Sequence, residues 1–488
     1  MKHEPGANRP QARIGAGPRL ARLLAAMLMV ALAVPIRAAV AAERRSEPTL
    51  SSPDYFPADS AVRSILRERV EAGKAAGYVV GLLEPDGSRR VIAFGTSDGP
   101  QSRPLDGATV FEIGSVTKVF TCSLLAEMAG RGEVRLDQPV ATLLPKTATV
   151  PARGDTVITL LDLASQYSGL PRLPNNLAPR DPSNPYADYT VEQLYAFLSG
   201  YSLPRAPGAR YEYSNLGMGL LGHALALRAK TSYEAVLTER VLKPLRMTDT
   251  RITLTPSMRT RLAVGHDGSG ARASNWDLPA LAGCGALRST ADDMLRFVAA
   301  NLDSGAAPLV TALHQAQTAR RTVGASVRIG LGWHTLSTFG AEIVMHNGGT
   351  GGYRSFTGFD PAMHVGVVVL SNTAGDVDDI GLHLLNRRFD LKPVVRHTEI
   401  AVEPARLDQL VGRYALAPTF VLTVTREGDA LFVQATNQPR LRAFAESDST
   451  FFFKDVEAQV SFSRDATGRA TGIVLHQAGR STPGPREP

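Results

Sequence analysis

The stretch Phe111-Glu-Ile-Gly-Ser-Val-Thr-Lys118 decides the fold, and a largely apolar run from Val119 to Leu125 follows it directly. A short polar segment that leads into such a run is typical of the start of a buried helix. We therefore predict a helix that begins near Ser115. Ser115 and Lys118 are three residues apart, so their side chains share one face of the first helical turn.

Ser115 and Lys118 together have the chemistry of a nucleophile and its base. A serine hydroxyl is a poor nucleophile at neutral pH and needs a nearby group to accept its proton. Lysine can accept it when its pKa is lowered, and both the helix dipole and a desolvated site disfavour the ammonium form. Backbone N–H groups at the same helix start would face a developing oxyanion. The alternative is a helix cap beside a solvated lysine, because so short a pattern is common by chance.

Two further polar clusters lie far away in the sequence, Tyr213-Ser-Asn215 and His346-Asn-Gly348. Tyrosine can transfer a proton, and a strand-borne histidine beside glycines can bind a substrate group. On a strand, residues 346 and 348 point to the same face, so His346 can reach a cleft while Gly348 lets substrate approach the backbone. The three clusters together supply the groups that acyl transfer needs.

The order of these clusters resembles the penicillin-recognising serine hydrolases, the family of class C β-lactamases, D-alanyl-D-alanine peptidases and related serine esterases. The resemblance covers about residues 55 to 390. Further matching stretches, in the family's order, are Gly132-Glu-Val-Arg-Leu-Asp137, Ile158-Thr-Leu-Leu-Asp-Leu-Ala164, Ser168-Gly-Leu-Pro171, Pro207-Gly208 and His346-Asn-Gly-Gly-Thr-Gly-Gly352. With these matches, the helix-cap interpretation of Ser115 and Lys118 loses its force.

The resemblance implies catalytic roles for three side chains. Ser115 would be the acylated nucleophile and Lys118 its base partner. Tyr213 would pass the proton to the leaving group and later activate the deacylating water.

The resemblance also implies how the substrate is held. The backbone N–H groups of Ser115 and Gly349 would form the oxyanion hole. Asn215 would hydrogen-bond the amide side chain of the substrate, and His346 and Gly348 would complete the binding surface.

His346 is the main departure from the β-lactamase pattern, because class C β-lactamases normally carry lysine at this place. A permanent cation binds the carboxylate of a β-lactam, whereas histidine, with a pKa near ~6.5, is mostly neutral at pH 7. We therefore expect an exported serine hydrolase, first of all a D-alanyl-D-alanine carboxypeptidase/endopeptidase that acts on peptidoglycan stem peptides. A β-lactamase and a small-ester esterase remain alternatives, as does a catalytically inert cell-wall binding protein.

Hydrophobic periodicity predicts an α+β (mixed α/β) fold for residues 55–390. Strand patterns occur at 78–94 and again at 332–371, and between them the chain is mostly helices and Pro/Gly-rich loops. Strands at both ends of a domain imply one antiparallel sheet with helices packed on it and a separate helical lobe. We expect the catalytic cleft between the sheet and this lobe.

The pattern changes to short strands in residues 403–480, after a polar linker. Strands are expected at 420–425, 430–435, 441–444, 450–453, 458–462 and 472–476. Such a meander predicts a small antiparallel β-barrel or curled sheet. It resembles the lipocalin-like domain that follows the catalytic domain in some members of the family.

Residues 1–41 have the features of a secretory signal peptide. Four arginines precede the apolar run Leu23 to Val34, and Ala39-Val-Ala41 offers a small-residue cleavage site. The segment holds six Lys/Arg and one Asp/Glu, so the rest of the chain carries 47 Lys/Arg against 45 Asp/Glu. This nearly balanced charge gives no reason to expect a nucleic-acid role. We expect export to the periplasm or beyond, with no stable membrane span after removal of the signal. Membrane association through an uncleaved signal is the alternative.

Cys122 and Cys284 are the only cysteines of the chain. Two cysteines this far apart form no disulfide framework, and we expect a buried thiol at Cys122 rather than a bridge. The ten histidines show no metal-binding spacing, so neither a metal nor another cofactor is expected.

Overall fold

The computed structural model describes residues 55–98, 103–394, 396–436, 438, 440–454, 456, 458–477 and 480–488. The described chain divides into two compact units, one up to Arg396 and the other from His397 to Pro488. The predicted signal peptide, residues 1–41, lies outside the described residues. Within the described part, no helix combines the length and apolarity needed to cross a membrane.

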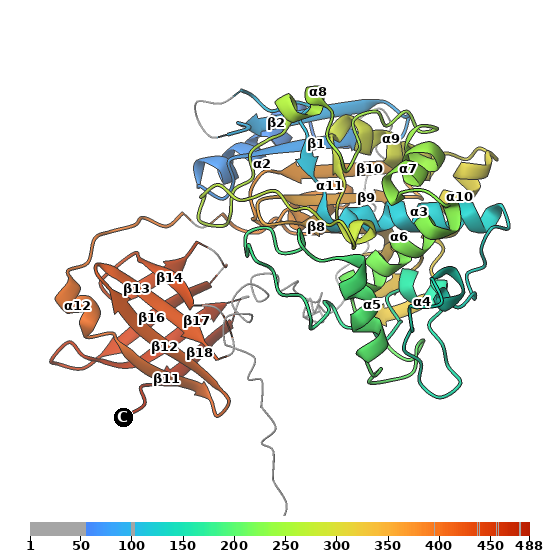
Figure 1. The fold of residues 1–488 in the computed structure, drawn as a ribbon. Helices are drawn as coiled ribbons and strands as arrows, with labels where there is room; N and C mark the ends of the chain where they lie inside the picture. Colours follow the sequence, from blue (N-terminus) through green and yellow to red (C-terminus); the bar gives the residue numbers. More distant parts are fainter. Residues whose placement is uncertain are drawn as a thin grey trace, which may run out of the picture. The chain divides into compact units, whose positions relative to one another are not determined.

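An eight-stranded antiparallel sheet forms the middle of the first unit, in the order β2-β1-β10-β9-β8-β7-β6-β5 (Figure 1). Its strands are β1 (Gly77–Leu83), β2 (Arg89–Gly95), β5 (Arg321–Gly324), β6 (Val327–Ile329), β7 (His334–Thr338), β8 (Ala341–Gly349), β9 (Arg354–Asp360) and β10 (Val365–Ser371). β1 pairs with β10 from Tyr78↔Ser371 to Leu83↔Gly366. The two ends of the domain therefore build one sheet, as predicted.

The alternation of side chains along β1 explains why helices cover both faces of the sheet. Val80 and Leu82 pack in one core with α2 (Asp59–Glu71) and α11 (Asp378–Leu385). Val79 and Leu83, which point to the other side of the strand, belong to the core on the opposite face, where α9 (Ala291–Leu302) packs. Burying one such side chain contributes about 1.5–3 kcal/mol, so a strand apolar on both faces is stable only between two layers.

Helix α3 (Thr117–Gly130) is the centre of the helical lobe. Nearly every side chain along it is buried, and it packs against α6 (Asn215–Ala229) and α10 (Pro308–Gln317). The other helical elements are η2 (Gly114–Val116), η3 (Val140–Leu143), α4 (Leu160–Ala164), α5 (Val191–Gly200), α7 (Tyr233–Leu237), η4 (Thr238–Leu242), α8 (Pro256–Arg261) and η5 (Ala282–Cys284). A helix apolar all round can exist only inside such a bundle.

Short strands beyond the predicted ones extend the fold. β5 and β6 add an edge to the main sheet, in a region where mainly helices and loops were expected. β3 (Phe111–Glu112) pairs with β4 (Arg288–Ser289) in a separate two-stranded ribbon. Strands of two to four residues are too short for a periodicity signal, so only their pairing partners reveal them.

The second unit is a nearly closed eight-stranded antiparallel barrel in which each strand pairs with the next. Its strands are β11 (Gly412–Ala417), β12 (Phe420–Glu427), β13 (Ala430–Ala435), β14 (Arg440–Ala445), β15 (Thr450–Phe453), β16 (Ala458–Arg464), β17 (Ala470–Gln477) and β18 (Arg480–Pro485), and α12 (Pro404–Asp408) precedes them. The Glu487 N–H donates to Arg413 O at 2.8 Å, which brings the chain end back to β11. Tyr414, Val424 and Phe462 are among the side chains that fill the interior.

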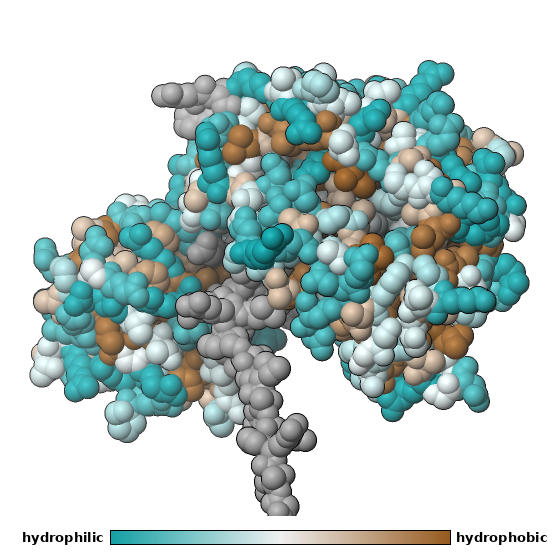
Figure 2. Space-filling model, in the orientation of Figure 1, coloured by the Kyte–Doolittle hydropathy of each residue, from teal (hydrophilic) through white to brown (hydrophobic). Residues whose placement is uncertain are grey.

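The surface is mostly hydrophilic on the face that Figure 2 shows, with apolar areas scattered between polar ones. Among the described residues, the large apolar side chains that are exposed are Val157, Phe339, Met363 and Ile400. They come from four distant places in the sequence, which is ordinary for a folded surface.

Candidate active site

Ser115 and Lys118 lie where η2 runs directly into α3. Lys118 Nζ is 2.9 Å from Ser115 Oγ. Ser115 is partly exposed, whereas Lys118 is fully buried. The two predicted partners therefore share one face of the helix start, with the hydroxyl accessible and the amine enclosed.

Burial lowers the pKa of Lys118 from 10.5 to about 7, because an ammonium group loses its hydration in the interior. Repulsion from Arg172 acts in the same direction. Lys118 Nζ also donates a hydrogen bond to Cys284 O at 2.7 Å. One N–H is thus held by a carbonyl, and the lone pair of the neutral amine remains free to accept the Ser115 proton.

Tyr213 lies beside this pair, just before α6. Lys118 Nζ is 4.8 Å and the Arg172 guanidinium carbon 5.1 Å from the centre of its ring. Burial raises the pKa of Tyr213, and the nearby Ser115 hydroxyl opposes the rise. The phenol is therefore protonated at neutral pH, and the Arg172 cation beside it favours any negative charge that it acquires.

The start of α6 fixes the position of Asn215. Ser214 caps the helix by accepting a hydrogen bond from the Gly217 N–H at 2.8 Å, and its hydroxyl donates to Pro171 O at 2.6 Å. Asn215 Nδ2 donates to Tyr186 Oη at 3.3 Å. The second motif is therefore a rigid helix start rather than a mobile loop.

His346 is on β8, and its environment keeps the imidazole neutral. Its Nδ1 lies 2.6 Å from Asn347 O, and its ring centre is 5.4 Å from that of His334 on β7. Burial lowers the pKa of His346 well below 6.5, and His334 and Lys118 add to this effect. A protonated His346 would carry its charge in a buried site beside Lys118 and His334, which explains why its pKa falls.

Three buried polar atoms, one each from Tyr213, Asn215 and His346, lack a hydrogen bond to any described residue. They are Tyr213 Oη, Asn215 Oδ1 and His346 Nε2. The ring centres of Tyr213 and His346 are 6.4 Å apart, and Asn215 is the first residue of α6, two positions after Tyr213. Leaving a buried polar atom unpaired costs about 1–3 kcal/mol, so this arrangement suits a polar substrate that supplies the missing partners.

The backbone of β8 passes very close to the backbone before Ser115. A Cβ at Gly348 would lie 2.1 Å from Ile113 O and 3.0 Å from Ser115 N. A Cβ at Gly114, whose φ is +48°, would lie 2.6 Å from Gly349 N. Glycine at 348 thus lets the backbone of residues 113–115 lie against the strand. This adds to its predicted role, which is to let substrate approach the strand backbone. The two amides predicted for the oxyanion hole, Ser115 N–H and Gly349 N–H, are brought close together.

Two residues near Ser115 were missed by the sequence reasoning, Arg172 and Cys284. Arg172 directly follows Ser168-Gly-Leu-Pro171, a stretch that the family resemblance already marked, so its position was a usable signal. Cys284 contributes only its carbonyl, which no residue-type pattern reveals. Both cysteines are buried free thiols.

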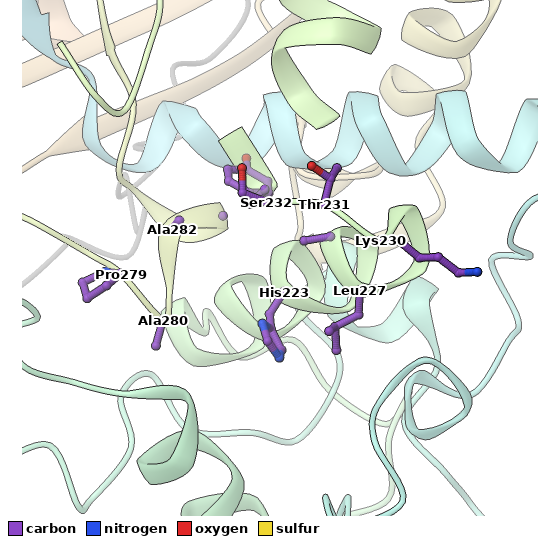
Figure 3. Close-up of a pocket in the computed structure, with 11 residues that line it drawn as sticks. His223, Leu227, Lys230, Thr231, Ser232, Pro279, Ala280 and Ala282 are labelled. Carbon is purple, nitrogen blue, oxygen red and sulfur yellow. The ribbon is translucent and has the colours of Figure 1, made fainter. Parts of the chain in front are cut away.

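A pocket of about 600 Å³ lies elsewhere in the helical lobe, beside α6 (Figure 3). Its lining includes His223, Leu227, Lys230, Tyr233 and Ala282. None of the three predicted catalytic side chains lines it, so it is distinct from the Ser115 group, although turn η5 contributes to both. Among the described residues, no group of three or more His, Cys, Asp or Glu side chains is arranged to hold a metal ion.

Two family models match parts of this chain. The Beta-lactamase family model matches residues 62–389, and residues 396–483 match DUF3471, a domain of unknown function. The lipocalin-like character of the second unit therefore stays a prediction.

Individual relatives agree with the family match. The chain is 33% identical over 306 residues to the D-alanyl-D-alanine-carboxypeptidase/endopeptidase AmpH of Escherichia coli K12, covering 59% of this chain and 78% of AmpH. It is 27% identical to a β-lactamase of the same strain, over 62% of this chain and 85% of that enzyme. A solved β-lactamase/D-alanine carboxypeptidase from Yersinia pestis, complexed with citrate, shares the fold with a TM-score of 0.57 at 24% identity, over 64% and 92% of the two chains.

Proposed function

The chain belongs to the β-lactamase family of serine hydrolases, and on that basis we propose that it cleaves D-Ala-D-Ala peptide ends through an acyl-enzyme at Ser115. The observation that carries this proposal is the 2.9 Å contact between Ser115 Oγ and a fully buried Lys118. A lysine held with a pKa near 7 is half neutral at neutral pH and can act as a base.

Acylation begins when Ser115 Oγ attacks the carbonyl carbon of the substrate. Its proton passes to Lys118 Nζ, and the carbonyl oxygen becomes an oxyanion between the N–H groups of Ser115 and Gly349. The C–N bond then breaks as Tyr213 donates its proton to the leaving amine and regains one from Lys118. The products are an ester at Ser115 and a free amine.

In deacylation, water is the nucleophile and the proton transfers run in the opposite direction. Tyr213 accepts a proton from the water as the oxygen attacks the ester carbonyl, and at the same time passes its own phenolic proton to the neutral amine of Lys118. The ester C–O bond breaks, Ser115 Oγ takes the proton, and a carboxylic acid leaves. The two groups act as one coupled proton reservoir, since each lies within the electrostatic reach of the other.

A peptide substrate is favoured over a β-lactam for two reasons. The relative named as a carboxypeptidase/endopeptidase is 33% identical, against 27% for the E. coli β-lactamase. His346 stands where β-lactamases of class C carry lysine, and its pKa is lowered well below 6.5. A neutral imidazole offers a hydrogen bond but no charge at this position. What counts against a β-lactamase is therefore the residue type itself, since histidine at this place is familiar in the peptidase and esterase branches.

The neutral His346 also supports a second candidate, hydrolysis of small esters. An ester without a carboxylate needs no cation on β8, and the unpaired atoms of Tyr213 and Asn215 can bind it equally well. The proposed peptide substrate belongs to the cell wall, so the proposal includes export through the signal segment predicted at residues 1–41.

A panel of three acyl donors tests the proposal. The protein without residues 1–41 is incubated with an N-acetylated Lys-D-Ala-D-Ala peptide, a fluorescent penicillin and 4-nitrophenyl acetate. We expect release of D-Ala, and covalent labelling by the penicillin that Ser115→Ala abolishes. Ser123→Ala, at a buried hydroxyl bonded to Val119 O, is the matched control and should keep both reactions. Peptide left intact while the ester is turned over would favour the esterase, and labelling that survives Ser115→Ala would exclude Ser115 as the nucleophile.

A further inference from the structure

Arg172 is a permanent cation in contact with the proposed catalytic group. Its guanidinium carbon lies 5.1 Å from the centre of the Tyr213 ring. The side chain is partly exposed, and it makes no hydrogen bond or ion pair with any described residue beyond this ring contact. Its five N–H donors are therefore free to bind a group from solution.

The backbone of Arg172 is fixed to the second motif. Its carbonyl oxygen accepts hydrogen bonds from the N–H groups of Asn215 at 3.0 Å and Leu216 at 3.3 Å. Ser214 Oγ donates to the preceding carbonyl, Pro171 O, at 2.6 Å. The side chain thus projects from a rigid position beside Tyr213 and Asn215, as a binding residue requires.

Two other arginines of the first unit have carboxylate partners. Arg205 pairs with Glu212, and Arg321 pairs with Asp162 at 2.7 Å. Arg321 makes a comparable ring contact, 4.6 Å from the centre of Tyr167, yet its charge is balanced. Arg172 therefore differs from them in lacking a counter-ion among the described residues.

We propose that Arg172 binds the terminal carboxylate of the acyl donor, and so selects peptides with a free C-terminus. This inference rests on the peptidase function proposed above. A guanidinium binds a carboxylate through two parallel N–H···O bonds, and partial burial strengthens such a pair. The cation that class C β-lactamases carry on the third-motif strand is thus supplied here from the loop between α4 and α5.

Two peptides that differ only in the terminal charge test this assignment. We compare kcat/KM for N-acetylated Lys-D-Ala-D-Ala with that for the same peptide ending in a carboxamide, and 4-nitrophenyl acetate reports the integrity of the catalytic group. In Arg172→Gln we expect kcat/KM for the free acid to fall about 10- to 100-fold, mainly through KM, because a hydrogen bond to a charged group is worth that much. The carboxamide and the ester should lose less, and their common loss reports the removal of the positive charge beside Lys118 and Tyr213. Arg172→Lys should recover part of the loss, since lysine keeps the positive charge but cannot form the two parallel N–H···O bonds of a guanidinium.

Arg210→Gln is the matched control, because it removes the same charge from an exposed position in the loop between α5 and α6. It should leave the ratio between the two peptides unchanged. An equal loss on both peptides in Arg172→Gln, or no loss on either, overturns the role of Arg172 while the peptidase function stands. If the wild type turns over the ester but neither peptide, the peptidase function fails and this inference fails with it.

Discussion

The carbonyl oxygen of Cys284 accepts a hydrogen bond from Lys118 Nζ at 2.7 Å, across 166 positions of the chain. The carbonyl belongs to η5, a turn that packs against both α3 and α6. Because the group is a carbonyl and not a carboxylate, it orients the amine without providing a full negative charge. This geometry is consistent with a lysine that is enclosed and yet able to lose its proton near neutral pH.

The activity should rise with pH through about 7. The pKa of Lys118 is lowered from 10.5 to about 7, so the neutral base is scarce below that pH and predominant above it. For 4-nitrophenyl acetate, a substrate that does not titrate, we expect log kcat/KM to rise with unit slope below about pH 7 and then level off. His346 should add no step in this range, because its pKa is already well below 6.5. A profile that is flat from pH 5 to 9 would contradict Lys118 as the base.

Lys118→Met should abolish activity while stabilising the fold. The folded-state pKa of Lys118 is below the unfolded value, so the unfolded chain binds more protons between about pH 7 and 10.5. The burial penalty is therefore full below about pH 7 and disappears as pH approaches 10.5. We expect the gain in unfolding free energy of Lys118→Met to be largest at pH 6 and to shrink by pH 9, measured by urea denaturation. Lys146→Met, at an exposed lysine, should show no such pH dependence.

Tyr213→Phe should lower kcat by about 10²–10⁴-fold, the usual contribution of a positioned proton donor. The ring remains, so its contacts with Lys118 and Arg172 remain, and the melting temperature should change little. Tyr211→Phe is the comparison, since its hydroxyl is bonded to His334 Nε2 at 3.1 Å rather than left unpaired. If the two variants lost activity equally, the phenol of Tyr213 would have no special role in proton transfer.

Gly348→Ala should be more damaging than Gly349→Ala. The new methyl at 348 would lie 2.1 Å from a backbone oxygen, Ile113 O, so the strand or the nucleophile loop must move. At 349 the nearest atom is the end of the Arg354 side chain, 2.7 Å away, which can shift more easily. We expect Gly348→Ala to lose activity at least tenfold more than Gly349→Ala, with a lower melting temperature. Equal effects would mean that the close approach of β8 to Ser115 is not needed.

Much of the fold followed from local sequence patterns, because its longer elements have strong periodicity. Strands β1 and β2, helix α3 and the strands from β7 to β10 all occur within a few residues of the expected positions. β18 was missed because Arg480-Ser-Thr-Pro-Gly-Pro485 has the composition of a linker. It becomes a strand only by pairing with β17, and prolines are tolerated there because the strand is the last in its sheet.

The candidate site was predictable only in part. The motifs around Ser115, Tyr213 and His346 are short local patterns. The family resemblance indicated that they form one site. The neutrality of His346 depends on His334 from the neighbouring strand and on Lys118 from the helix, so it is a property of the assembled fold. The role proposed for Arg172 depends on the absence of a counter-ion among the described residues, which no sequence window shows.

The pairing of β1 with β10 has a consequence for the nascent chain. Residues 84–364 must all be made before the partner of β1 exists, which at ribosomal speeds takes about 15 to 60 s. During that time β1, which is buried along its whole length in the finished protein, has an unpaired edge on the side where β10 will add. The catalytic domain should therefore fold late and as one unit, and any chain that stops before Val365 should aggregate rather than form a partial domain.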